Sequence, residues 1–146
     1  MANMSNFLEN KLIDFLFRQQ TYTPPTALYF GLFTTPPTDS TPGVEPAAPS
    51  YSRAGTATGL TMFSSTNAPD DTEISAGSSG ITYNQQNIVF PDPEEEWGAV
   101  THVGVFDAIT GGNYLFWGEL IHPRDFVVGD VNIQFQPGEI SFRIDN

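Results

Sequence analysis

Two histidines are the first residues to consider for catalysis or metal binding. His102 lies between Thr101 and Val103, and His122 precedes Pro123. The two fall in different local segments, so their spacing does not predict a metal-binding pair. A serine hydrolase triad has no support either, because the chain has no Gly-x-Ser-x-Gly elbow. No catalytic residue is therefore predicted.

A run of acids between residues 92 and 96 could bind a hard cation such as calcium. The acids are Asp92, Glu94, Glu95 and Glu96. They lack the D-x-[DN]-x-[DN]-G spacing of a calcium loop, so a solvated acidic loop is the simpler interpretation, and cation binding stays open. The chain has no cysteine, which excludes disulfides and thiolate metal sites. No metal site and no cofactor are predicted.

Composition and charge argue against nucleic-acid-binding, membrane-associated and disordered proteins. The chain has 146 residues and a formal net charge of −12, so it repels nucleic-acid phosphates and anionic membrane surfaces. No apolar run approaches the roughly 20 residues of a membrane-spanning helix. Aromatic residues make up 13% of the chain, enough to fill a core and argue against disorder. We expect one domain, residues 1–146, that binds neither nucleic acid nor membrane.

One segment, residues 6–20, has the periodicity of a helix. Asn6 is the expected N-cap, and the Thr23-Pro24-Pro25 sequence cannot continue the helix. An apolar face of this width must be covered, either by the protein's own sheet or by another subunit, and both alternatives stay open. The residues proposed for this core or docking face are Phe7, Leu8, Leu12, Phe15 and Leu16, and Ile13 and Phe17 widen it.

The rest of the chain, residues 26–146, predicts a mainly β fold. Aromatic and β-branched runs bounded by turn residues indicate an antiparallel β-sandwich of about seven or eight strands, with long loops at 34–50 and 64–80. The Thr110-Gly111-Gly112-Asn113 sequence predicts a hairpin turn. Strands are expected at 27–33, 51–63, 87–90, 97–108, 114–121, 131–135 and 140–144.

The loop at 34–50 is unusually rich in proline. Its prolines are Pro36, Pro37, Pro42, Pro46 and Pro49. Such a segment can be neither a helix nor a central strand, and it is stiff with few internal partners. We therefore expect it to lie along a neighbouring protein, which favours a component of an assembly over an enzyme.

Several segments together carry a family resemblance. They are residues 21–35, Tyr51-Ser52-Arg53, 87–91, 97–108 and 110–118. The most specific part is W-G-x-V-T-H-x-G-[IV]-[FW]-D-A over 97–108. The series resembles a family of small tailed-phage virion proteins that often carry the name tail fibre protein. Close relatives are capsid cement, or decoration, proteins. The chain departs from this pattern at 34–50, which is longer, and at 62–83, which looks inserted, so a partner surface formed there would be specific to this virus.

The resemblance implies a virion structural protein without catalytic activity. It implies a capsid cement role on the outer face of the head, bridging major capsid subunits, with copies of the chain forming a trimer at local threefold positions. The protein would be made in the host cytoplasm and end in the virion. A tail-associated role, as fibre adaptor or baseplate component, is the alternative. Independently of the resemblance, a glycan-binding module is a further alternative, with Trp97, Trp117 and several tyrosines as the stacking platform. Trp97, His102, Phe106 and Trp117 are expected in core packing and hairpin geometry.

Overall fold

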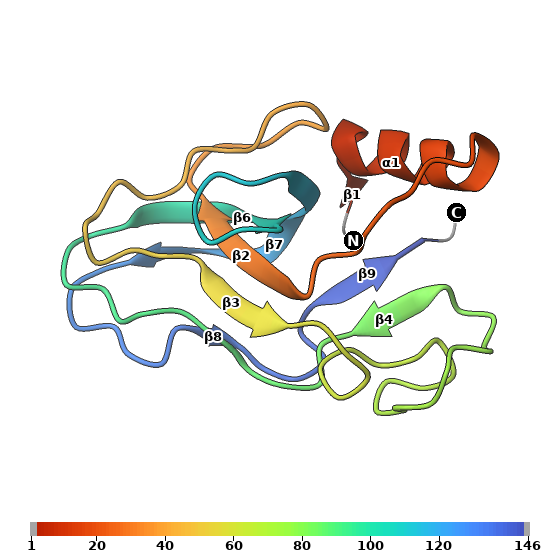
Figure 1. Ribbon diagram of the computed structural model, residues 1–146. Coiled ribbons are helices and arrows are strands. Elements are labelled where there is room, and N and C mark those ends of the chain that lie inside the picture. The colour runs from red at the N-terminus through yellow and green to blue at the C-terminus, as the bar shows by residue number, and fades with distance from the viewer. Residues whose placement is uncertain (1–2, 145–146) are drawn as a thin grey trace.

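A five-stranded antiparallel sheet is the main layer of the protein in the computed structural model, which describes residues 3–144 (Figure 1). In spatial order its strands are β1 (Asn3–Met4), β7 (Tyr114–Phe126), β6 (Gly98–Phe106), β2 (Ala27–Phe33) and β3 (Ala54–Ala57). The β6–β7 hairpin turns at Gly111 and Gly112, whose φ angles of 60° and 74° explain why glycine is needed there. The predicted hairpin at 110–113 is thus confirmed.

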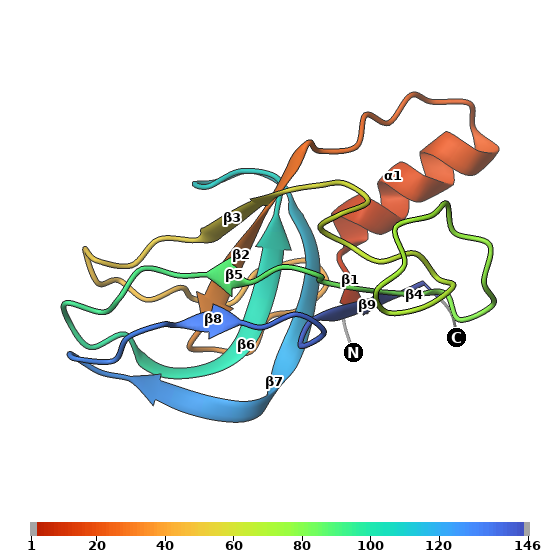
Figure 2. The ribbon, with the colours of Figure 1, turned by 90° about the horizontal axis from the view of Figure 1, so that it is seen from below.

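Two short ribbons form the second layer. One pairs β4 (Ile81–Tyr83) with β9 (Ser141–Arg143), and the other pairs β5 (Ile88–Val89) with β8 (Gln134–Phe135). Figure 2 shows β5 and β8 lying across the face of the main sheet. The predicted fold class is confirmed, since the protein is mainly β, its strands are antiparallel, and its one described helix is N-terminal.

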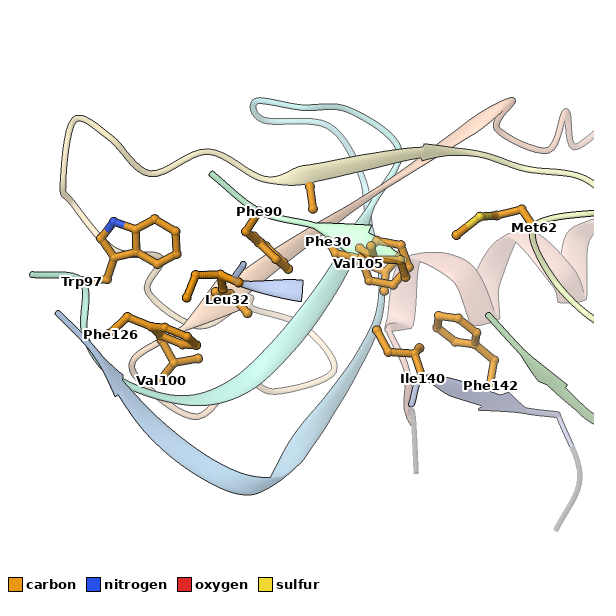
Figure 3. Close-up of a cluster of buried hydrophobic side chains, with 13 residues drawn as sticks. Phe30, Leu32, Met62, Phe90, Trp97, Val100, Val105, Phe126, Ile140 and Phe142 are labelled. Atoms are coloured by element: carbon orange, nitrogen blue, oxygen red, sulfur yellow. The ribbon is translucent and has the colours of Figure 1, made fainter. Parts of the chain in front are cut away.

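The main core fills the space between the two layers. Phe30 and Leu32 project into it from β2, Val105 from β6, and Ile88 from β5, and all four are almost fully buried. Figure 3 shows Trp97, Val100 and Phe126 at one end of this core and Met62 and Phe142 at the other. The expected core positions of Trp97 and Phe106 are confirmed, because both are buried.

The opposite face of the sheet is buried as well. Phe33, Phe106 and Tyr114 form a second cluster there, and Tyr29 and Trp117 pack against it. A strand covered on both faces needs apolar side chains in succession rather than in alternation. This explains the continuous apolar run in β2, Ala27–Phe33.

Gly104 on β6 makes room for the ring of Phe33. A Cβ at Gly104 would collide with that ring, which is fully buried and cannot move into solvent. We expect Gly104→Ala to lower the free energy of unfolding by about 1–3 kcal/mol, measured by urea denaturation. In a Phe33→Leu background the same substitution should cost less. Equal costs in the two backgrounds would contradict the collision as the cause.

The helix α1 is shorter than predicted and begins with a different cap. It spans Asn6–Phe17 rather than 6–20. The left-handed φ of 55° at Gln19 stops it, and the Asp14 carbonyl accepts the N–H groups of both Arg18 and Gln20. The N-cap is Ser5, not Asn6.

The sequence does not predict Ser5 as the cap, because one of its two hydrogen-bond partners, Tyr114, is 109 residues away in the chain. Its hydroxyl accepts from the Leu8 N–H and donates to the Tyr114 carbonyl on β7, and the residue is buried. Ser5→Ala leaves both groups without this partner, and we expect a loss of about 1–2 kcal/mol in the free energy of unfolding. Asn6→Ala, at an exposed side chain, is the control and should cost about 0.5 kcal/mol or less. Equal losses in the two variants would contradict Ser5 as the cap.

The strand boundaries also differ from those predicted. The described residues hold nine strands, and β1 and β4 were not expected. β7 continues to Phe126 instead of ending at 121, because its register against β6 shifts between Glu119 and Arg124 and so accommodates Pro123. The strand expected at 131–135 is reduced to Gln134–Phe135, since Asn132 adopts a left-handed φ of 58°.

Candidate functional site

The second half of α1 carries apolar side chains that the rest of the described chain does not cover. Figure 1 shows the helix at one end of the molecule, beside the sheet and not over it. Leu8 is its only buried residue and packs where α1 contacts β7. Leu16 is 65% exposed and Phe17 is 79% exposed, and Ile13 and Phe15 are about half exposed. These four residues, Ile13, Phe15, Leu16 and Phe17, are called the helix strip below.

The predicted contact residues of the helix therefore divide into two groups. Leu8 belongs to the protein's own core, and Phe7 and Leu12 are half-buried. Phe15 and Leu16 are available to a partner. Ile13 and Phe17, four residues apart, lie on the same side of the helix as Leu16 and extend that surface, and this spacing can be read from the sequence.

The helix that carries the strip also differs from the rest of the chain in its net charge. α1 and its C-cap carry Glu9, Lys11, Asp14 and Arg18, which sum to zero, whereas the whole chain has a net charge of −12. Arg18 and Asp14 pair at 2.8 Å on the helix surface. A neutral apolar surface can approach a partner without the repulsion that the rest of the molecule would generate.

The proline-rich loop packs on its own sheet, contrary to the expectation that it has few internal partners. Pro37 and Pro46 are buried, whereas Pro36, Pro42 and Pro49 are exposed. The loop covers the second face of the sheet, because Phe33 lies close to Gly43. The Trp117 indole N–H also donates to Asp39 at 3.0 Å. Contact with a partner stays a prediction for the three exposed prolines.

A buried ion pair holds this loop in place. The Arg53 guanidinium donates to Glu45 at 2.8 Å, and the Tyr51 hydroxyl also donates to Glu45 at 2.8 Å. Burial, followed by the Glu45 charge, raises the pKa of Tyr51, so its hydroxyl stays protonated. That oxygen accepts the Leu32 N–H at 2.8 Å. We call Glu45, Tyr51 and Arg53 the loop latch.

Arg53 extends the loop latch to the β6–β7 hairpin. Its Nη1 donates to the Ala108 and Gly111 carbonyls, both at 2.8 Å. The guanidinium also lies 3.4 Å from the centre of the Phe106 ring, a cation–π contact. The Arg53 donors are therefore occupied by internal contacts, and the role of the latch is structural.

An apolar groove of about 510 Å³ lies where the second layer leaves β7 uncovered. Phe116 and Leu120 of β7 line one side, and Phe135 and Phe142 line the other. Charged side chains, among them Glu119, Arg124 and Glu139, line the same groove, so its lining is mixed and indicates no particular ligand.

The histidines and the acidic residues at 92–96, the candidates for catalysis or metal binding, do not form a common site in the described structure. Among residues 3–144, no three His, Asp or Glu side chains come together in a way that could hold a metal ion. His102 Nδ1 lies 2.8 Å from the Thr101 hydroxyl. Asp92 and Glu95 accept backbone N–H groups from Asn132 and Ser50, respectively.

The stacking platform proposed for Trp97 and Trp117 is not formed. Trp97 is buried and packs against Tyr51 and Phe126, with ring centroids 5.2 and 5.7 Å away. Trp117 is half-buried and lies against His102. Both positions agree with the expectation of core packing, since Trp97 belongs to the main core and Trp117 packs against the second cluster.

A comparison with protein-family models gives a match over most of the chain. A family model described as podophage GP4 fiber I protein gp80 matches residues 3–143. No curated protein matches the chain. The helix that the structure describes, α1, lacks the length and apolar character needed to cross a bilayer.

Proposed function

The chain belongs to the podophage GP4 fiber I protein gp80 family and is a phage virion structural protein, and from this premise we propose that it is a tail-associated component. The match to residues 3–143 carries the proposal. It also confirms the resemblance to phage proteins that carry the name tail fibre protein. The fibre description fits a tail-associated role better than the capsid cement role.

The helix strip supports the proposal by supplying a surface for attachment. Leu16 and Phe17 remain largely exposed although the domain has a closed core of its own. Exposed apolar patches of this kind mark protein contact sites. In the proposed role, the helix strip contacts another virion protein, and the sandwich projects away from it.

The location in the particle is the direct test. A cryo-EM map of intact virions should contain density for this chain at the tail, in few copies, with α1 against its neighbour. Density on the outer face of the head, bridging major capsid subunits at local threefold positions, would overturn the proposal and favour the cement role. That second result would also test whether the chain forms a trimer.

A further inference from the structure

Two exposed isoleucines lie at the same end of the molecule as the helix strip. Ile74, on the loop 64–80, is 83% exposed, and Ile144, which follows β9, is 70% exposed. The Ile144 N–H donates to the Gly80 carbonyl at 3.0 Å, so the end of β9 and the end of this loop are joined. Figures 1 and 2 both show the C-terminal end of α1, the end of β9 and the loop 64–80 at one end of the molecule. We call the helix strip, Ile74 and Ile144 together the end surface.

The loop 64–80 holds Ile74 in a fixed position. The Asn67 side chain bridges the loop, since its oxygen accepts the Ala76 N–H at 2.8 Å and its amide donates to the Ile74 carbonyl at 3.3 Å. Asp71 accepts the Glu73 backbone N–H at 2.9 Å. An apolar side chain on a loop that is already ordered can enter a partner's pocket with little further loss of conformational entropy.

The loop is acidic, in contrast to the neutral helix. Between residues 62 and 83 the chain carries Asp70, Asp71 and Glu73 and has no Lys or Arg. Hydrogen bonds, first the one from the Glu73 backbone N–H, lower the pKa of Asp71. The Asp70 and Glu73 carboxylates are exposed and make no hydrogen bond or ion pair to any residue that the structure describes. Their charge is therefore open to a partner.

We propose that the end surface docks on a virion protein whose contact site is an apolar groove bordered by lysine or arginine side chains. The groove takes the apolar side of α1, because Ile13, Leu16 and Phe17 have the i, i+3, i+4 spacing of anchors in helix-in-groove recognition. The basic border pairs with Asp70 and Glu73 and fixes the orientation of the docked chain. This inference rests on the proposed attachment through the helix strip and adds the chemistry of the partner's site.

A second copy of the chain fits the end surface less well than a basic partner does. Two copies that met through this surface would bring two acidic loops into one interface, and the loops would repel each other. The arginines of the elements at this end do not offset that charge. Arg18 is already paired with Asp14, and Arg143 is half-buried.

Photo-crosslinking in intact virions tests whether one partner covers the whole end surface. The photoreactive residue p-benzoylphenylalanine replaces Leu16 in one variant and Ile74 in another, and the irradiated particles are analysed by mass spectrometry. Both positions should crosslink to the same virion protein. The same probe at Val128, which lies outside the end surface, should not reach that protein. If position 74 does not crosslink to the protein that position 16 captures, the inference is wrong.

Charge reversal tests the basic border of the partner's site. Asp70→Lys combined with Glu73→Lys should lower incorporation into virions at least about tenfold. The matched control is Glu94→Lys combined with Glu96→Lys, which makes the same change of charge at two exposed acids. The carboxylates of these two acids likewise have no partner among the described residues, so the urea midpoint should be unchanged in both double variants. Equal incorporation of the two double variants would overturn the inference.

These readouts are independent of the location of the chain in the particle. Crosslinking and incorporation are measured on whole virions, so they can fail although cryo-EM places the chain at the tail. They can also succeed although cryo-EM places it on the head. A failure of the proposed function is thereby distinguished from a failure of this inference.

Discussion

Replacing Arg53 by methionine is expected to lower the free energy of unfolding by about 3–5 kcal/mol, the cost of leaving one partner of a buried ion pair uncompensated. The Arg53 side chain is only 8% exposed and Glu45 is 25% exposed, so solvent screens the pair weakly. The substitution leaves the Glu45 carboxylate without its cation. It also removes the donor to the Ala108 and Gly111 carbonyls.

Methionine is chosen because it keeps much of the apolar stem that packs against Phe106. Guanidinium chloride denaturation, with the m-value checked for two-state behaviour, measures the loss. Glu45→Gln should cost less, because glutamine can still accept from Tyr51. The double variant should cost less than the sum of the two single changes.

Arg18→Met is the control for the loss of a positive charge. Arg18 pairs with Asp14 on the exposed surface of the helix, and such pairs contribute about 0.3–0.5 kcal/mol. If Arg53→Met costs no more than Arg18→Met, the loop latch does not hold the proline-rich loop on the sheet. We would then expect that loop to be mobile in solution.

The second large effect is expected on assembly. Leu16→Glu combined with Phe17→Glu should reduce incorporation into virions at least tenfold while leaving the free energy of unfolding within about 0.5 kcal/mol of the unchanged chain. Both side chains are largely exposed in the free protein, so a charge there costs little. In a contact with a partner, each carboxylate would be buried without a counter-charge.

The matched control is Val128→Glu combined with Val131→Glu. These residues are 62% and 61% exposed and lie outside α1 and outside the segments 34–50 and 62–83, and the change adds the same two negative charges. Incorporation is measured by mass spectrometry of purified particles after complementation of a phage that lacks the gene. Equal incorporation of the two double variants would contradict the helix strip as the attachment surface.

Some of the architecture is determined locally and could be predicted. The apolar run of β2 and the Gly111-Gly112 turn are set by side-chain type and by glycine's tolerance of positive φ. The helix was predicted from its period, but its ends were not. Ser5 caps it with the help of Tyr114, which is 109 residues away, and no local pattern contains that partner.

Whether a surface is covered could not be predicted, because coverage depends on which distant segment reaches it. The sequence by itself determined that α1 has a wide apolar face and that residues 34–50 form no regular element. That the helix strip is exposed could be learned only from the tertiary structure. Within the described residues, α1 contacts the sheet through its N-terminal turns, where Leu8 is buried. The structure likewise buried Pro37 and Pro46, because the loop latch joins their loop to β3 and the β6–β7 hairpin. Periodicity specifies which side of an element is apolar, whereas long-range contacts select what packs against it.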